Sequence, residues 1–500
     1  MPKILGKIGL LVLALVAGAA WLVILRLKSV PVPLLVVYGL LLAASAAGTL
    51  WPGVLGRRRV LTFLGVPAGV ATFGLYLAVV YHVTDLPVLL ALAAVACLAS
   101  AVPRGRRRAD GGATRPSRRV FLAGGAGLAL GALSALAAGH ADRRRRDLLT
   151  RGEAQRQAAI RAPGARRRIA DGKVRVFPIH TGDTIVTYGQ FYGGLDGWEG
   201  LNGYLRTLLD KAQIAVPVHA YLIDHPRHGL MLVDTGVNWE QAHDHDGYYG
   251  ITSRLLTERD EYRLTPAQDL RVRLARLGYD AGDVTTVFLT HVHDDHAGGL
   301  RHLPRAEVVL DRRDWDQGVL YPHSFDLVKE RLSFPAFDSG AFGAFPAAQD
   351  HFGDGSVVLL PAPGHSPGHM CVLLRLDGGG SALFLGDTLY TLPHLATDQV
   401  RQMTIGGADT VHQIEAARRV QRLLAADPGL VPLFAHDNTR YQSDLVTAAF
   451  TDGSPGEAGL RELRRHMEAV LTPGWRLRPG HTPHFVPPAS GTGPGRVEFR

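Results

Sequence analysis

Residues 290–299 read THVHDDHAGG and directly follow a β-branched, apolar run at 284–289. The stretch places three imidazoles and a carboxylate at H-x-H-x-D-H spacing, on His291, His293, Asp295 and His296. An ordinary core segment would not carry these groups, because burying them without partners is costly. Nitrogen and oxygen donors of this kind suit Zn²⁺. The spacing therefore predicts a metal site at the end of a strand and is favoured over a solvated polar loop.

Four shorter motifs share this arrangement, in which an apolar run leads to a polar residue. They are LVDTG at 232–236, PGHSPGH at 363–369, FLGDT at 384–388 and FAHD at 434–437. The end of a strand holds a side chain rigidly, and the loop that follows leaves it open to approach. The polar residues of these motifs are therefore candidates for functional positions.

The five motifs, in this order, resemble those of the metallo-β-lactamase superfamily, and the resemblance covers about residues 173–445. It implies an α/β fold, the αββα sandwich of two packed mixed β-sheets flanked by helices. It also implies two metal ions, most simply zinc. The first ion would take His291, His293 and His365, the second Asp295, His296 and His436, with Asp387 bridging them. Asp234 would support the ligands without binding metal, and His369 would be structural.

The chain from Lys173 onward also has the local pattern of α/β structure. Short β-branched runs between Gly, Pro and Asp turns predict strands at 174–180, 218–224, 230–234, 285–290, 306–310, 357–361, 370–376, 382–385 and 430–434. Longer amphipathic stretches predict helices at 266–277, 410–426 and 456–470.

A dinuclear site with a bridging carboxylate predicts hydrolysis. Two metal ions lower the pKa of a shared water toward neutrality, so a hydroxide can attack a carbonyl without a serine or cysteine nucleophile. A redox di-iron site is less favoured, because diiron relatives commonly carry a glutamate where this chain has His293. We predict Asp295 and Tyr390 as the catalytic residues.

Tyr390 lies three residues after Asp387, as in the quorum-quenching lactonases that open acyl-homoserine lactones. The resemblance to that branch implies a small lactone or ester substrate. A phenol at this position could donate a hydrogen bond to the substrate carbonyl or to the oxyanion that develops from it. An ordinary packing role for the tyrosine remains an alternative.

Two other functions stay open. A sister hydrolase of the same fold would act on thioesters, phosphotriesters or β-lactams with the same metal ligands and a different pocket. In a different class, the N-terminal region would be the working part and the metal domain a sensor module. The complete set of seven ligand positions argues against the sensor, which would be free to lose some of them.

Charge divides the chain into two parts. Residues 1–170 hold 24 Lys and Arg against 5 Asp and Glu, leaving 30 and 40 for residues 171–500, out of 54 and 45 in all. The arginines form short clusters between apolar runs, which predicts a lipid membrane as partner. Because the excess of basic residues lies outside the folded domain, which is acidic, nucleic acid is not expected as a partner. Cys97 and Cys371 provide neither a disulfide framework nor a cysteine-based zinc site.

Four apolar stretches at 8–25, 34–51, 60–83 and 86–102 are each long enough to cross a bilayer as a helix. The segment at 104–141 contains Arg118 and Arg119 before an Ala/Gly-rich run, and resembles a twin-arginine export signal. A fifth transmembrane helix is the alternative. Both alternatives place the hydrolase domain on the extracytoplasmic side of the cell membrane.

We therefore expect five regions: a four-span all-α transmembrane bundle at 1–103, the signal or fifth span at 104–141, a basic linker or surface helix at 142–172, the hydrolase domain at 173–486 and a disordered tail at 487–500. The HDHD run at 243–246 is expected to be a loop near the pocket mouth rather than a second metal site. The aromatic residues expected to be able to wall an acyl pocket are Tyr248, Tyr249, Tyr262 and Phe325.

Overall fold

The computed structural model describes residues 146–161, 171–193, 195, 210–249, 261–316, 324–396, 409–489 and 493–500. The predicted four-span bundle at 1–103 and the signal or fifth span at 104–141 lie outside these residues. Within the described ranges, no helix combines the length and the apolar character needed to cross a bilayer. Residues 151–253 and 260–500 form one compact unit, which carries the predicted metal ligands.

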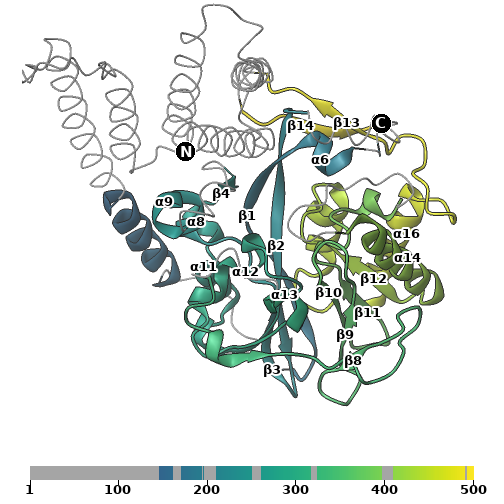
Figure 1. Ribbon diagram of the computed structural model, residues 1–500, viewed down its shortest axis with the longest axis horizontal. Coiled ribbons are helices and arrows are strands. Elements are labelled where there is room, and N and C mark those ends of the chain that lie inside the picture. Colours follow the sequence, from purple (N-terminus) through teal and green to yellow (C-terminus); the bar gives the residue numbers. More distant parts are fainter. Residues whose placement is uncertain are drawn as a thin grey trace, which may run out of the picture. The chain divides into compact units, whose positions relative to one another are not determined.

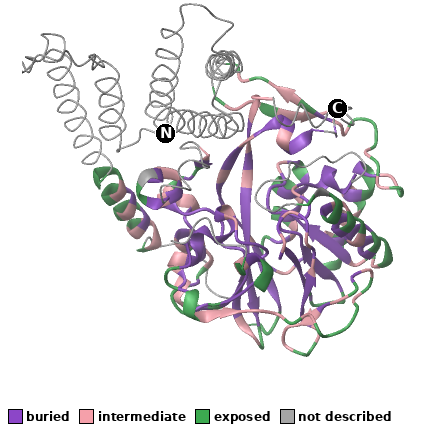
Figure 2. Ribbon diagram, in the orientation of Figure 1, coloured by how far each residue is buried: buried purple, intermediate pink, exposed green. Residues whose placement is uncertain are grey.

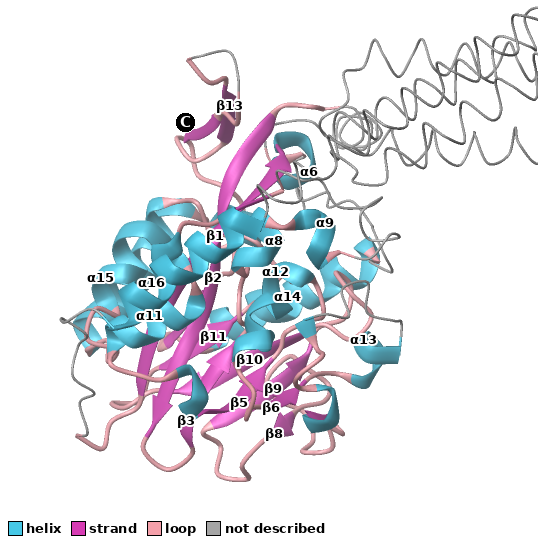
Figure 3. Cartoon of the chain, turned by 90° about the vertical axis from the view of Figure 1, so that its left-hand side faces the viewer, coloured by secondary structure: helices cyan, strands magenta, loops and turns pink. Residues whose placement is uncertain are grey.

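Two mixed β-sheets pack face to face in this unit, with helices on the outer side of each (Figures 1 and 3). Within the described residues the first sheet has seven strands, in the order β4 (Tyr262–Arg263), β1 (Arg175–Thr187), β2 (Gln213–His225), β3 (Gly229–Val233), β5 (Val284–Phe288), β6 (Glu307–Val309) and β7 (Leu332–Ser333). The second has five, in the order β12 (Leu430–Leu433), β11 (Ser381–Phe384), β10 (Met370–Arg375), β9 (Val357–Pro361) and β8 (Gln349–Asp350). This is the predicted α/β arrangement of mixed sheets.

The helices are short around the first sheet and longer around the second. They are α6 (Tyr188–Tyr192), α8 (Trp239–His243), α9 (His245–Tyr248), α11 (Leu270–Leu277), α12 (Asp294–Ala297), α13 (Arg312–Asp316), α14 (Thr410–Ala426), α15 (Thr447–Ala449) and α16 (Glu457–Val470). Single 3₁₀ turns lie at Pro266–Gln268, Ala281–Asp283, Gly298–His302, Lys329–Arg331 and Leu392–Leu395, and a π-helical turn at Tyr441–Val446.

The first sheet is buried on both faces, because successive side chains of a strand point in opposite directions. In β3, Met231 joins the core that lies between the two sheets, whereas the next residue, Leu232, packs with Leu270 and Leu274 of α11. Figure 2 shows the result: the strands are largely buried and the exposed residues lie on the outer helices and loops. A sheet held from both sides is a rigid support for the loops at its edge.

All nine predicted strands are present, and α14 and α16 match the helices predicted at 410–426 and 456–470. The helix predicted at 266–277 is shorter, because residues Pro266–Gln268 form a separate 3₁₀ turn and α11 begins at Leu270. The strand predicted at 174–180 runs on to Thr187 as β1, and β2 starts at Gln213 rather than 218. These two strands pair along their whole length with a register shift between His180 and Gly182. Their extra residues were missed because β1 contains Gly182 and Asp183, which are unfavourable in strands.

At the ends of the domain, one expectation is corrected and one alternative is confirmed. The tail at 487–500 is not disordered throughout, because β14 (Arg496–Phe499) pairs antiparallel with β13 (Pro483–Val486) and Phe499 contacts Tyr192. The segment at 142–172, expected to be a linker or a surface helix, contains a helix at 146–161. Its residue Arg156 is only 1% exposed and forms an ion pair with Asp269. Both segments were judged by composition, which does not register a contact with a distant part of the chain.

Candidate metal centre

The seven predicted ligands come from loops at one edge of the two sheets. β3 and β5 of the first sheet run parallel, as do β11 and β12 of the second, so the carboxyl ends of each pair lie at the same edge. His291 follows β5, Asp387 follows β11 and His436 follows β12. At this edge the sheets are joined by backbone hydrogen bonds from Met370 N to Thr290 O and from His219 N to Ala435 O. The ligand loops of both sheets are thereby held together.

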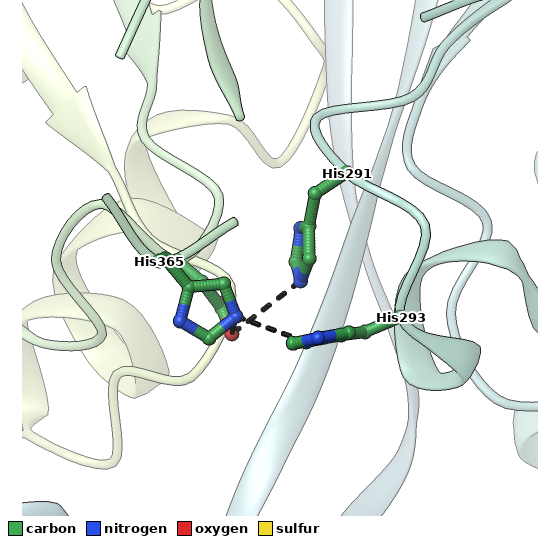
Figure 4. A group of neighbouring side chains, drawn as sticks. His291, His293 and His365 are labelled. Atoms are coloured by element: carbon green, nitrogen blue, oxygen red, sulfur yellow. Dashed lines mark hydrogen bonds and ion pairs between the residues drawn. The ribbon is translucent and has the colours of Figure 1, made fainter. Parts of the chain in front are cut away.

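The structure brings all seven side chains together in two groups. Within each group, one ligand atom of every residue lies within 4.8 Å of the others. The first group is His291, His293, His365 and Asp387, and the second is Asp295, His296 and His436. Figure 4 shows His291, His293 and His365 converging from two different loops. These are the same two sets that the sequence motifs imply.

Asp387 spans the two groups with its two carboxylate oxygens. Oδ2 lies 3.2 Å from Nε2 of His365 and 3.8 Å from Nε2 of His291. Oδ1 lies 3.2 Å from Nε2 of both His296 and His436. One oxygen therefore faces each group, which is the arrangement expected of a bridging carboxylate.

The second ring nitrogen of most of these histidines has a partner that selects the tautomer. Nδ1 of His296 lies 2.8 Å from Oδ2 of Asp234, and Nδ1 of His436 lies 2.9 Å from the carbonyl oxygen of Pro217. Because these oxygens can only accept, each Nδ1 carries the proton and donates it. Nε2 is then left with a free lone pair that points into the site, as metal binding requires.

Asp234 has the supporting role expected for it and does not join either group. Its Oδ1 accepts from the backbone N–H of Thr290, and its Oδ2 accepts from the Thr290 hydroxyl as well as from His296. The hydroxyl in turn lies 3.1 Å from Nδ1 of His291, for which it serves as acceptor. Asp234 has φ 57°, a left-handed conformation that aspartate tolerates better than most residues. One strained turn thus orients two of the predicted ligands.

The donor atoms fit divalent metal ions and are poorly satisfied without them. Nε2 of His291 and Oδ1 of Asp387 are buried and have no hydrogen-bond partner among the described residues. Nδ1 of His293 lies 2.9 Å from Nε2 of His365, so in the absence of metal one of these two nitrogens carries a proton and donates it to the other. Five imidazoles and two carboxylates are the nitrogen and oxygen set that suits zinc-like ions.

Burial sets the protonation of the site. It lowers the pKa of His291 and of His365 well below the ordinary value, together with their histidine neighbours. For Asp387, burial alone would raise the pKa, but His296, His436 and His365 hold it well below the usual range. Neutral imidazoles around an ionised carboxylate are the forms that bind metal. Burial alone would lower the pKa of His296 and His436, but Asp387 raises it in both, so each of these rings would release a proton as metal binds.

Tyr390 lies beside the first group, as the sequence suggested. Its hydroxyl is 3.3 Å from Nδ1 of His365, and its ring meets those of His365 and His436 edge-on at 5.8 Å. The ring also stacks on Phe191 of α6, with centroids 4.9 Å apart. The phenol therefore reaches the site and is at the same time packed against a neighbouring element.

His369 is structural, as predicted. Its Nε2 accepts from the backbone N–H of Asp387, and its Nδ1 lies 3.2 Å from the hydroxyl of Thr388. Gly386 lets the ring approach this closely, since a Cβ there would lie 2.7 Å from Nε2 of His369 and the residue has φ 49°. His369 thus holds the turn that carries the predicted bridging aspartate.

Sequence reasoning missed Asp314 of α13. Its buried carboxylate accepts from the backbone N–H groups of Val292 and Gly368 and from the Ser366 hydroxyl, which ties the His291–His293 loop to the His365 loop. No motif marked it, because an aspartate after an arginine pair looks like an ordinary surface residue. It was identifiable only from the fold.

The four aromatic residues suggested as pocket walls are all buried. Tyr249 and Tyr262 donate their hydroxyl hydrogens to Asp294, which lies between the predicted ligands His293 and Asp295. Burial and the neighbouring Asp295 raise the pKa of Asp294 to about 7. The two phenols thus support the ligand loop. The run at 243–246 is not a loop, since it lies in α8 and α9 and the cap between them, and it joins neither metal group.

The family model described as metallo-beta-lactamase superfamily matches residues 214–450, which contain all seven predicted ligands. N-acyl homoserine lactonase AttM of Azorhizobium caulinodans is 30% identical over 252 residues, covering 48% of this chain and 89% of the relative. N-acyl homoserine lactonase AiiA of Bacillus thuringiensis subsp. kurstaki is 25% identical over 239 residues, covering 46% and 85%. A solved N-acyl homoserine lactone hydrolase with N-hexanoyl-L-homoserine bound is 19% identical with a TM-score of 0.41, covering 54% and 95%.

Proposed function

The chain belongs to the metallo-β-lactamase superfamily and is a metal-dependent hydrolase, and from this premise we propose that it opens the ring of N-acyl homoserine lactones. Support comes from the relatives named above, which are lactonases of that kind, and from the position of Tyr390 beside His365. The observation that carries the proposal is the phenol hydroxyl at the edge of the two ligand groups, where a bound carbonyl would need a donor.

Two zinc ions are the proposed cofactors. His291, His293 and His365 would hold one, Asp295, His296 and His436 the other, and Asp387 would bridge them. Bound there, such ions supply a hydroxide nucleophile near neutral pH and polarise a carbonyl oxygen. We include Asp295 among the proposed catalytic residues because it belongs to the second group, where its carboxylate lies 3.5 Å from Nε2 of His436.

Tyr390 would act as a hydrogen-bond donor to the lactone carbonyl. If His365 binds metal through Nε2, its Nδ1 carries a proton and donates to the Tyr390 oxygen 3.3 Å away. The phenol hydrogen is then free to point at the substrate. Donation to an oxygen that gains negative charge in the transition state lowers the barrier to ring opening.

The proposed location is the extracytoplasmic face of a cell membrane. This rests on the sequence alone: on the four apolar stretches within residues 1–103, on the arginine clusters beside them, and on the 104–141 segment that resembles a twin-arginine signal. A hydrolase held outside the cytoplasm would meet a diffusible lactone before it reached the cell interior.

Turnover of a substrate panel by the purified full-length chain tests the function. The panel contains N-acyl homoserine lactones, a thioester, a phosphotriester and a β-lactam. We expect kcat/KM for the lactones to exceed that for the others by at least about a hundredfold, a gap of roughly 2.7 kcal/mol in transition-state binding. Preference for another class would assign the chain to a sister hydrolase and contradict the proposal.

Metal analysis tests the cofactor independently of the substrate. Elemental analysis should give close to two zinc ions per chain, and Asp387→Ala should lose metal and activity together. Full metal content and turnover in that variant would contradict the bridging assignment.

A further inference from the structure

The Tyr390 ring lies in a small aromatic cluster whose centre is His394, a buried residue of the 3₁₀ turn Leu392–Leu395. The His394 ring stacks on Tyr192 with centroids 5.4 Å apart and planes 7° from parallel. It meets Phe191 edge-on at 5.3 Å and Tyr390 edge-on at 5.5 Å. Phe191 and Tyr390 stack directly on one another, 4.9 Å apart. Four rings from two segments therefore share one packed cluster.

Hydrogen bonds at both ring nitrogens fix the orientation of the His394 ring. Nε2 lies 2.7 Å from the carbonyl oxygen of Phe191, which can only accept, so Nε2 carries the proton. Nδ1 accepts from the backbone N–H of Thr391 and lies 2.7 Å from its hydroxyl. Burial lowers the pKa of His394 to about 4, in keeping with a neutral ring that has one donor and one acceptor. Both polar atoms are used, and neither faces the metal ligands.

These bonds join α6, on the side of the first sheet, to the loop after β11 that carries Asp387 and Tyr390. Phe191 is near the end of α6, which follows β1 of the first sheet. Thr391 follows Tyr390 in the loop that leaves β11 of the second sheet and carries Asp387. The carboxyl end of α6 is anchored again by Tyr192, whose hydroxyl donates to Asn438. A shift of α6 relative to this loop would remove the stacking surface of the Tyr390 ring.

We propose that His394 is a positioning residue for Tyr390: by holding Phe191 against the phenol ring, it fixes the hydroxyl beside His365. The inference rests on the proposed lactonase function, in which that hydroxyl donates to the substrate. It assigns to His394 no contact with substrate or metal. Loose positioning of a donor lowers turnover more than ground-state binding, because the hydrogen bond strengthens as charge develops.

The test begins with His394→Phe, which keeps an aromatic ring and deletes the hydrogen bonds at both ring nitrogens. We expect kcat to fall about tenfold with KM unchanged within twofold, at full metal content. His394→Gln retains a side-chain N–H that can reach the Phe191 carbonyl and should recover part of the loss. The matched control is His225→Phe, another buried histidine that accepts backbone hydrogen bonds, placed at the β2–β3 turn. The control should lose stability without losing kcat.

The decisive comparison repeats His394→Phe in a Tyr390→Phe background. If His394 acts through the phenol, the substitution should then change kcat by less than twofold, since there is no hydroxyl left to position. An equal loss in both backgrounds, or parent-like kcat for His394→Phe alone, would overturn the proposal. Should His394→Phe not fold, Thr391→Val takes its place in the same cycle; it removes the hydroxyl 2.7 Å from Nδ1 and leaves the backbone N–H in place.

A spectroscopic measurement separates this inference from the proposed function. With ¹³C-labelled tyrosine, the Tyr390 ring signal is identified by its loss in Tyr390→Phe. In His394→Phe we expect that signal to shift or broaden, because Phe191 is no longer held against the Tyr390 ring. This expectation does not depend on which substrate the enzyme uses. An unchanged signal would overturn the positioning role. A changed signal in a protein that hydrolyses no lactone would contradict the proposed function while supporting the positioning role.

Discussion

At the scale of single residues, what matters is which nitrogen of each histidine keeps its proton. His296 donates from Nδ1 to Asp234 and therefore presents the Nε2 lone pair to the site. The same logic applies to His436, with a backbone carbonyl as acceptor. A histidine of the right spacing but with the opposite tautomer would present an N–H to the metal and could not bind it.

Asp234→Asn tests this dependence. The amide would place an N–H group opposite the Nδ1–H of His296 or lose a bond to Thr290, so the ligand tautomer is no longer enforced. We expect metal affinity to fall by about 10- to 100-fold, measured by competition with a chromophoric chelator. Asp316→Asn, an exposed residue of α13, is the control and should bind metal as the parent does. Parent-like affinity in Asp234→Asn would show that the tautomer is set elsewhere.

Tyr390→Phe deletes only the hydroxyl and keeps the ring that packs on Phe191. Because the hydrogen bond strengthens as charge builds on the carbonyl oxygen, lactone turnover should fall on the order of tenfold or more while KM changes little. Steady-state kinetics at matched metal content measure both. Tyr441→Phe removes another buried hydroxyl, one that donates to Pro432, and should leave turnover unchanged. If Tyr390→Phe matches the parent in both constants, the tyrosine is structural.

At the scale of elements, the helix at 146–161 belongs with the catalytic unit from residue 151 onward. Arg156 pairs with Asp269 and lies over the ring of Trp239, and Gly152 allows the helix to approach that ring closely. Trp239 opens α8, whose Gln241 donates to the carbonyl of Asp294. The helix is thus packed onto the element that supports the metal-binding loop.

Arg156→Ala should therefore destabilise the domain. Removal of the guanidinium leaves Asp269, 1% exposed, with Arg271 as its remaining cation. The loss should therefore be smaller than the about 3–5 kcal/mol that a fully broken buried ion pair costs, and larger than that of a surface substitution. Urea unfolding of the full-length chain followed by tryptophan fluorescence measures the loss. Arg161→Ala, exposed on the same helix, is the control and should change stability by less than about 0.5 kcal/mol. Equal midpoints for the two variants would mean that the helix is not anchored.

At the scale of the whole molecule, the uneven distribution of charge along the chain is the main indication of where the protein is located. A basic N-terminal third with long apolar stretches precedes an acidic catalytic region, and this supports attachment to a membrane. Within the described residues no helix could span a bilayer, and the attachment remains a prediction about residues 1–141.

Reporter fusions test the proposed topology. A reporter that is active only outside the cytoplasm, fused after residue 500, should be active in cells that carry the export pathway for folded proteins. Replacing Arg118 and Arg119 together with lysine should abolish that activity if the 104–141 segment is a twin-arginine signal. Reporter activity that persists in the lysine variant would leave the fifth-span alternative. A reporter that is inactive in both the parent and the variant would contradict the extracytoplasmic location.

The sequence by itself determined the elements and the ligand set. Short β-branched, apolar runs and the Gly, Pro and Asp turns between them predicted the strands that precede the ligand loops, since this pattern is local to the chain. The seven predicted metal ligands were assigned through the resemblance of five short motifs to those of the metallo-β-lactamase superfamily, and the structure brings these side chains together in two groups. Tyr390 was accessible for the same reason, at three residues from Asp387.

Only the tertiary structure decided which distant residues serve those positions. Asp314, His394 and Arg156 act across 52 to 203 residues of sequence on Ser366, Phe191 and Asp269, and nothing in their neighbouring residues marks them. The tail was misjudged in the same way, since β14 is stabilised by its pairing with β13 and by Tyr192 rather than by its composition. A ligand motif is local because it must present donors from one loop. The residues that fix the tautomers and the ring orientations of the ligand motifs come from distant parts of the chain, because the packing of the two sheets brings them next to the motifs.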